Sequence, residues 1–301
     1  MYWRIHKFAE LTHIRRIPYG CVHQKLSVNA PGTDAGTVVM LQADGIDECR
    51  KAVRLNLRRG ARLIKIFASG GIVSRDDSPR YQQLSDDELK VIVQEAERMG
   101  MICAAHAEGK AGIMASIRAG VKVIQHGSGA DEEVFEAMKK NNVMLVATIT
   151  RLQAILENED KYPPAMYRKT VELAKMHKAA YRSAVKAGVK CALGSDLFGG
   201  PGTVQAAGIN GNEIALAVSV GGMTILQAIE AATANGPLTL GPQAPKSGIV
   251  KEGYDADLLG LDADPLHDIE MMRKPKNIKY IWKRSKLVKA PGLDPWEVLD
   301  R

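Results

Sequence analysis

The chain contains few of the residues that mark specialised protein classes. Only 4 of its 301 residues are cysteine, no two of them form a CxxC pair, and aromatic residues make up 5% of the total. This usage excludes a dense disulfide framework and favours a reduced, cytoplasmic protein. Apolar runs are no longer than a strand, and charges interrupt residues 1–16, so we expect neither a membrane span nor a secretion signal.

What remains is the composition of an ordinary globular protein. Hydrophobic residues account for 46% of the chain and charged residues for 25%, which excludes a disordered chain and a coiled coil. The formal net charge of +7 is modest for this length and does not by itself indicate an anionic partner. A chain of this size buries a substantial core, as one large α/β domain or as two smaller domains.

From about residue 45, short apolar runs alternate with helical periodicity, which predicts consecutive β–α units around a parallel sheet. Ser85 and Glu88 form a capping-box pattern at the start of one helix, and Thr224 is a candidate N-cap for another. The predicted strands cover residues 62–67, 101–105, 121–125, 143–148 and 189–193, and the predicted helices cover residues 85–99, 110–119, 131–141, 167–187 and 225–234.

The pattern changes after residue 245. Glycines separate short apolar pieces without a helical period, so residues 246–301 are predicted to form a β-rich segment that follows an α/β domain at residues 1–245. Residues 273–289 carry eight lysines and arginines. No aromatic stacking platform accompanies them, so we interpret them as a solvated strand surface and expect no nucleic-acid partner.

Four polar residues lie where strands of a parallel α/β barrel bring side chains to a catalytic rim. His106 and His126 directly follow two predicted strands, Asp196 follows another after a Gly-Ser pair, and Lys65 lies inside the first. Singly, each is explained as well by a hydrogen-bonded histidine, a turn aspartate or an outward-facing lysine. Together, two imidazoles, a carboxylate and a lysine suit a divalent cation, and they predict a metal site.

Other catalytic motifs are absent from the sequence. It contains no GxSxG nucleophile elbow and no GxxxxGK[ST] phosphate loop. Cys103 and Cys191 lie inside predicted strands, which favours buried packing over a nucleophilic role. The metal site is therefore the favoured chemical interpretation.

The four residues stand in motifs that resemble the metal-dependent amidohydrolase superfamily, in particular its prolidase-like and imidazolonepropionase-like branch, which includes ochratoxinase-type amidases. The motifs are KIFASGG from Lys65, AHAEG around His106, QHG around His126 and GSD ending at Asp196. The resemblance covers about residues 43–288. It implies a TIM-type (β/α)8 metallo-hydrolase barrel, with these residues on strands four, five, six and eight, and a small β-sandwich to which residues 246–301 contribute.

The resemblance also implies a reaction, hydrolysis of the C–N bond of a small-molecule amide or dipeptide. Lys65 would be carbamylated by CO₂ and would bridge one metal ion to a second, with Zn²⁺ as the first candidate. His106 and His126 would hold the more exposed ion. Asp196 would bind the more buried ion and transfer the proton of the attacking water.

Loops beside these strand ends supply secondary candidates for substrate contact. Arg75, Arg80, Tyr81 and Gln82 follow the Lys65 strand, and Asn212 follows the Asp196 strand, in a side loop expected to cover the site. Loops are polar for ordinary reasons, so these residues rank below the four rim residues.

The sequence departs from the family at barrel strand one, because it contains no His-x-His pair. We therefore expect a truncated chain in which barrel strands one and two are missing and residues 20–26 form strand three. Loss of two nitrogen ligands predicts a weak or inactive hydrolase, and the alternative is a non-catalytic remnant that acts through binding. An open barrel exposes strand edges and apolar interior, which predicts a homo-oligomer or a partner that covers the edge.

Overall fold

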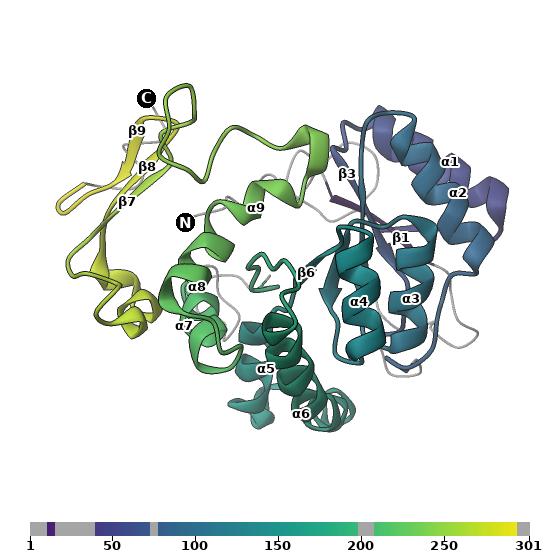
Figure 1. The fold of residues 1–301 in the computed structure, drawn as a ribbon, viewed down its shortest axis with the longest axis horizontal. Coiled ribbons are helices and arrows are strands. Elements are labelled where there is room, and N and C mark those ends of the chain that lie inside the picture. Colours follow the sequence, from purple (N-terminus) through teal and green to yellow (C-terminus); the bar gives the residue numbers. More distant parts are fainter. Residues whose placement is uncertain (1–10, 16–39, 73–77, 198–207, 294–301) are drawn as a thin grey trace.

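The computed structural model describes residues 11–15, 40–72, 78–197 and 208–293, and it has an α/β architecture (Figure 1). The main sheet has the strand order β2-β1-β3-β4-β5-β6, and every neighbouring pair is parallel. This confirms the predicted α/β class with a parallel sheet. The strands are β1 (Leu11–Arg15), β2 (Met40–Gln42), β3 (Leu63–Phe67), β4 (Cys103–Ala107), β5 (Val123–His126) and β6 (Met144–Val146).

Four of the five predicted strands correspond to β3, β4, β5 and β6. The fifth, at residues 189–193, makes only one parallel bridge, between Cys191 and Leu145, so it is shorter than predicted. The described strands do not close into a barrel, because β2 lies at one edge of the sheet and the Cys191 segment at the other. The strand predicted at residues 20–26 lies outside the described residues, and β1 pairs with β3 instead.

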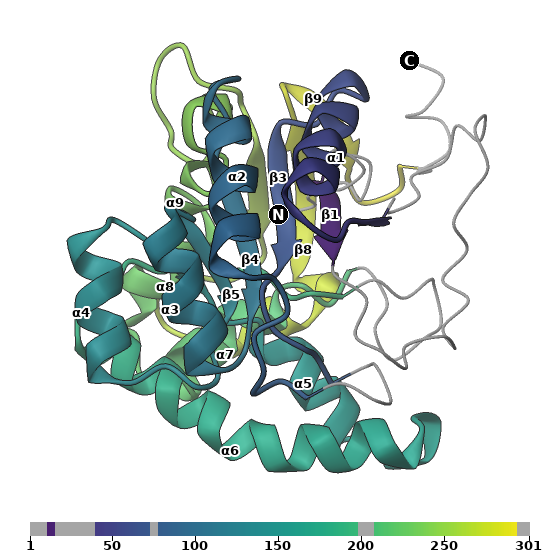
Figure 2. The ribbon, with the colours of Figure 1, turned by 90° about the vertical axis from the view of Figure 1, so that its right-hand side faces the viewer.

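Four helices lie side by side along one face of the sheet (Figures 1 and 2). In α2 the predicted capping box is present, with the Ser85 hydroxyl accepting from the Glu88 amide and the Glu88 carboxylate accepting from the Ser85 amide. A large apolar core that includes Ile64, Ile66 and Ile124 fills the space between sheet and helices. The helices are α1 (Ile46–Arg58), α2 (Asp86–Glu97), α3 (Lys110–Ala119) and α4 (Glu132–Lys140).

The remaining helices lie toward the other end of the sheet (Figure 1). The predicted N-cap Thr224 is confirmed, since its hydroxyl accepts from the Gln227 amide. The sequence analysis did not predict α5, α7 or α9 of this group, nor α1 described above. The strand predicted at residues 143–148 is shorter in the structure, since β6 ends at residue 146. Thr148, the last residue of the predicted strand, is instead the N-cap residue of α5. The helices are α5 (Ile149–Leu156), α6 (Pro164–Lys186), α7 (Asn212–Ser219), α8 (Ile225–Ala232) and α9 (Asn235–Leu238).

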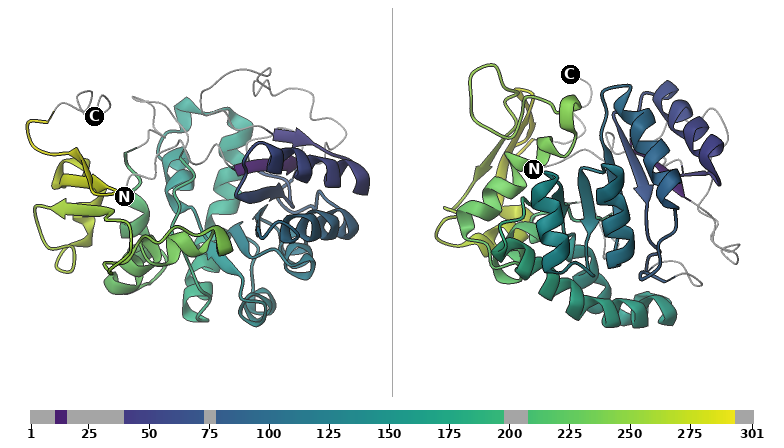
Figure 3. Two further views of the ribbon diagram at one scale, coloured as in Figure 1. Left: turned by 90° about the horizontal axis from the view of Figure 1, so that it is seen from above. Right: turned by 45° about the vertical axis from the view of Figure 1, so that its right-hand side comes forward.

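The C-terminal residues form a small antiparallel sheet at the opposite end of the molecule from α1 (Figure 3). Ile269, Met271 and Met272 pack beneath it against apolar residues of α7 and α8. The segment is therefore β-rich, while the domain boundary at residue 245 stays a prediction, and the described residues form no second sheet of a sandwich. Its strands are β7 (Leu258–Leu261), β8 (Ile278–Lys283) and β9 (Lys286–Lys289), with 3₁₀ turns η2 (Glu159–Lys161), η3 (Gly241–Gln243), η4 (Ile269–Arg273) and η5 (Pro275–Asn277) elsewhere.

None of the helices in the described ranges has the length and apolar character needed to cross a membrane. The cytoplasmic location stays a prediction.

Candidate metal centre

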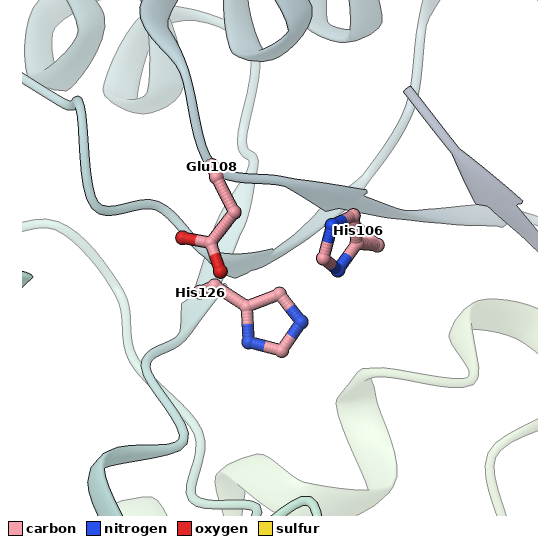
Figure 4. Close-up of side chains that lie close together, drawn as sticks. All are labelled: His106, Glu108 and His126. Carbon is pink, nitrogen blue, oxygen red and sulfur yellow. The ribbon is translucent and has the colours of Figure 1, made fainter. Parts of the chain in front are cut away.

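Three buried side chains converge at the carboxyl ends of β4 and β5: His106, Glu108 and His126 (Figure 4). One ligand atom from each residue lies within 4.8 Å of the other two, and the two imidazole rings meet edge to face at 4.6 Å between centroids. The sheet produces this arrangement, because the parallel register places residue 107 opposite His126 and strand alternation puts residues 106 and 108 on one face. The predicted meeting of His106 and His126 is therefore present.

The tautomer of His126 follows from its hydrogen-bond partner. Nδ1 of His126 lies 2.7 Å from the Thr148 hydroxyl oxygen, and that hydroxyl donates its own hydrogen to the Ala147 carbonyl at 2.6 Å. The hydroxyl is therefore an acceptor toward His126, so we assign the proton to Nδ1. This leaves Nε2 of His126 with a lone pair, which is the form a metal ligand requires.

His106 is oriented in the same way by a backbone group. Its Nε2 lies 3.1 Å from the Gly70 carbonyl oxygen, and because a carbonyl only accepts, we assign the proton to Nε2 and the lone pair to Nδ1. Burial, reinforced by the charge of Lys65, lowers the pKa of His106 to about 4. Burial, with His106 and Lys65 adding to it, also lowers the pKa of His126 well below its usual value. Both imidazoles are thus neutral at pH 7, as metal binding needs.

Glu108 is the member of this group that the sequence analysis did not predict. Its carboxylate accepts a hydrogen bond from the Ser128 hydroxyl, and its backbone amide donates to the Ser69 hydroxyl at 2.9 Å. Burial raises the pKa of Glu108 to about 7, and the Ser128 hydrogen bond acts in the opposite direction. A signal was present in the sequence, because Glu108 follows His106 by two residues and therefore shares its face of the strand.

Lys65 is buried in β3, on the face opposite Ile64 and Ile66, as strand alternation predicts. Burial lowers the pKa of its ammonium group to about 8, opposed by the negative charges of Asp196 and Glu108. A lysine with a lowered pKa has a larger neutral fraction, and the neutral amine is the nucleophilic form.

Among the described residues, Asp196 lies at the same rim but outside the group of three. Its backbone is left-handed, with φ of 53°, and its carboxylate forms an ion pair with Arg151 of α5. Arg151 was not predicted as a site residue. The pair leaves 13% of the Arg151 side chain and 30% of the Asp196 side chain exposed, so it is only partly screened by solvent.

A buried carboxylate from α7 completes the surroundings. Glu213 accepts hydrogen bonds from the amides of Ile149 and Thr150, at 2.9 and 2.8 Å, and from the Thr150 hydroxyl at 2.5 Å. These are unpaired donors of the first turn of α5, so Glu213 acts as a cap from another helix. Glu213 thereby fixes the start of α5. This is the segment that carries Thr148, the partner of His126, and Arg151, the partner of Asp196.

The secondary candidates for substrate contact are scattered. Arg75 lies outside the described residues, and the side chain of Tyr81 is 72% exposed. The Gln82 amide donates to the Leu84 carbonyl and to Asp86, at the start of α2. Asn212 was expected in a side loop. In the structure it is the first residue of helix α7. A helix begins here because residues 209–211 already make turn hydrogen bonds that lead into it.

Comparison with known proteins gives consistent results. The model of the amidohydrolase family matches residues 16–288. Ochratoxinase of Aspergillus niger is 49% identical over 256 residues, which are 84% of this chain and 52% of that protein. The chain thus spans about half the length of this curated relative.

Solved structures show the same relationship. The crystal structure of A. niger ochratoxinase matches with a TM-score of 0.79 and 44% identity, over 95% of this chain and 66% of that one. A Xaa-Pro dipeptidase with bound methionine in its active site matches with a TM-score of 0.75 and 29% identity, over 83% and 60% of the two chains. From its sequence motifs, its parallel sheet and these matches, the chain belongs to the amidohydrolase family.

Proposed function

We propose that this chain carries the catalytic centre of a metal-dependent hydrolase that cleaves the C–N bond of a small amide or dipeptide. The observation that carries the proposal is the convergence of His106, Glu108 and His126 beside the buried Lys65. Membership of the amidohydrolase family, with relatives named ochratoxinase and Xaa-Pro dipeptidase, supports this class of reaction.

The donor set fits a divalent ion such as Zn²⁺. Two neutral imidazoles and a carboxylate are ligands that zinc commonly takes, and each of the three has a hydrogen-bonded partner that fixes its orientation. An ion bound there would supply Lewis-acid chemistry, which polarises the scissile carbonyl and makes a water molecule more acidic.

In this proposal Lys65 contributes an anionic oxygen ligand. Its neutral amine attacks the carbon of CO₂, a new N–C bond forms, and one amine proton leaves to solvent, which gives a carbamate. Burial favours this step, because it lowers the pKa of Lys65 to about 8 and enlarges the neutral fraction. The carbamate would join the ligands of one ion or bridge two.

Asp196 is the proposed proton carrier. Its carboxylate would accept a proton from the attacking water and deliver it to the nitrogen of the leaving amine. The ion pair with Arg151 orients this carboxylate at the rim. An oligomer or a partner at the open edge of the sheet remains part of the proposal.

The test is metal content, measured by plasma mass spectrometry on the purified chain after exposure to zinc and bicarbonate. We expect about one ion per chain or more in the parent, loss of metal in His126→Ala, and retention in the control His267→Ala, whose histidine is exposed. A carbamate should add its mass to the parent and not to Lys65→Ala. Metal together with turnover of an amide or dipeptide panel supports the hydrolase, whereas a chain without metal supports the non-catalytic alternative.

A further inference from the structure

Thr148 occupies the N-cap position of helix α5 but turns its hydroxyl away from the helix. Threonine is a favoured residue at this position, because its hydroxyl can accept from an amide of the first turn. Toward the described first turn of α5, however, the Thr148 side chain makes no capping hydrogen bond. Its backbone is left-handed, with φ of 60° and ψ of 44°, instead of the extended backbone that a capping threonine usually has.

The Thr148 hydroxyl is engaged at the candidate metal centre. It donates to the Ala147 carbonyl and accepts from Nδ1 of His126. The side chain therefore serves the end of β5 and not the start of α5. The first amides of α5 need an acceptor from another part of the chain, because a helix leaves these donors without partners of its own.

Glu213 supplies that acceptor. One of its carboxylate oxygens accepts from the Ile149 amide, and the other accepts from both the amide and the hydroxyl of Thr150. The Glu213 side chain is buried, with 3% exposure. Burial raises the pKa of Glu213 to about 7, and the hydrogen bonds from Thr150 and Ile149 act in the opposite direction because they favour the ionised form.

The start of α7 holds Glu213 in a fixed place. A Cβ on Gly211 would collide with the Met272 carbonyl, so α7 begins in direct contact with η4. Leu216, one turn further along α7, is buried in the large apolar core between the sheet and its helices. The carboxylate that caps α5 thus projects from a helix that is itself packed on two sides.

We propose that Glu213 is a positioning residue: it caps α5 in place of Thr148 and so keeps the Thr148 hydroxyl available to His126. The inference rests on the metal site of the proposed function, in which His126 is a ligand. Thr148 lies two residues before Thr150, which is a usual separation between an N-cap residue and the amide that its side chain accepts from. Without Glu213, the Thr150 amide would compete with His126 for this hydroxyl. Loss of the partner that orients a ligating histidine lowers metal affinity by about 10- to 100-fold.

Glu213→Gln keeps the size of the side chain but replaces one acceptor oxygen by an amide group that donates. The matched control is Glu88→Gln, since the buried Glu88 carboxylate also accepts two backbone amides, those of Gly45 and Ser85, at the start of α2, which carries no candidate ligand. We expect Glu213→Gln to weaken Co²⁺ binding by about 10-fold or more and to change the visible absorption of the bound ion, which reports ligand geometry. Glu88→Gln should bind Co²⁺ within about 2-fold of the parent. Equal losses in the two variants would overturn the proposal.

Thr150→Val is a milder second variant. It removes only the hydroxyl that donates to Glu213 at 2.5 Å and keeps the shape of the side chain. We expect a smaller loss of Co²⁺ affinity than in Glu213→Gln, with a change of the absorption in the same direction. Affinity and absorption that match the parent in Thr150→Val would count against the proposal even if Glu213→Gln did not fold.

A double-mutant cycle tests whether Glu213 acts through Thr148. In a Thr148→Val background, where the hydroxyl is already absent, Glu213→Gln should weaken Co²⁺ binding by less than about 2-fold further. An equal loss in both backgrounds would overturn the inference and leave the metal site standing. A parent chain that binds no Co²⁺ would overturn the metal site and the inference together.

Discussion

Nδ1 of His126 lies 2.7 Å from the hydroxyl oxygen of Thr148, and both residues have left-handed backbones, with φ of 73° and 60°. Such conformations cost about 1–3 kcal/mol each in residues other than glycine, and they persist where surrounding contacts impose them. His126 is the last residue of β5 and Thr148 lies two residues past the parallel neighbour β6, so the hydrogen bond joins two strained strand ends. The strain therefore lies next to a candidate metal ligand, with Asp196 a third such residue at the rim.

Thr148→Val keeps the shape of this side chain and removes its hydroxyl. We expect the affinity for Zn²⁺ to fall by about 10- to 100-fold, because His126 loses the partner that fixes its tautomer and ring orientation. Calorimetric titration measures the change. The matched control is Thr170→Val, since Thr170 is also buried and its hydroxyl donates to the Met166 carbonyl within α6. Equal losses in both variants would show that the Thr148 hydroxyl has no special role in metal binding.

Gly127 directly follows the candidate metal ligand His126. Gly127→Ala should lower the free energy of unfolding more than Gly188→Ala does. Gly127 has φ of 74°, and a Cβ there would lie 2.8 Å from Cδ1 of Leu145. Gly188 has φ of 75° with nothing within 4 Å of its Cβ position, so Gly188→Ala isolates the backbone strain of about 1–2 kcal/mol. We expect Gly127→Ala to lose about 1–3 kcal/mol more, from overpacking, in urea unfolding experiments. Equal losses would mean that Leu145 moves aside without cost.

The stability contributed by His177 should depend on pH. Burial lowers the pKa of His177 to about 4 in the folded chain, below its usual value of 6.5. As pH falls from 6.5 toward 4, the unfolded chain therefore binds a proton that the folded chain does not, and stability is lost. The loss approaches about 1.4 kcal/mol per pH unit for one such group.

His177→Asn cannot take up this proton. The difference in free energy of unfolding between parent and variant, measured in urea at several pH values, should therefore shrink as pH falls through this range. A difference that does not change with pH would show that His177 is protonated equally in both states.

Bound zinc should stabilise the folded chain. Ligand that binds only the folded state adds about 2.7 kcal/mol at 100 times its dissociation constant. We expect Zn²⁺ to raise the melting temperature, a chelator to reverse the rise, and acid to weaken the effect because protons compete for His106 and His126. Differential scanning calorimetry with and without the chelator makes the measurement. A rise of equal size in His126→Ala would place the stabilising ion elsewhere.

The sequence by itself determined the features that depend on neighbours along the chain. Short apolar runs predicted β3 to β6, and the Ser85 and Thr224 caps predicted the starts of α2 and α8. The same local pattern placed His106 and His126 at strand ends and Lys65 on the face opposite the helix-side core. Such features are readable because helix and strand periods repeat over a few residues.

Only the tertiary structure decided the contacts between distant segments. Glu108 meets Ser128 and, through it, His177, 69 positions further along the chain than Glu108. Asp196 pairs with Arg151, and α5 begins because Glu213, on a later helix, caps its first turn. No local period encodes these pairings. They arise because packing α5, α6 and α7 against the sheet removes polar groups from water, and each buried group must then find its partner wherever the fold brings one.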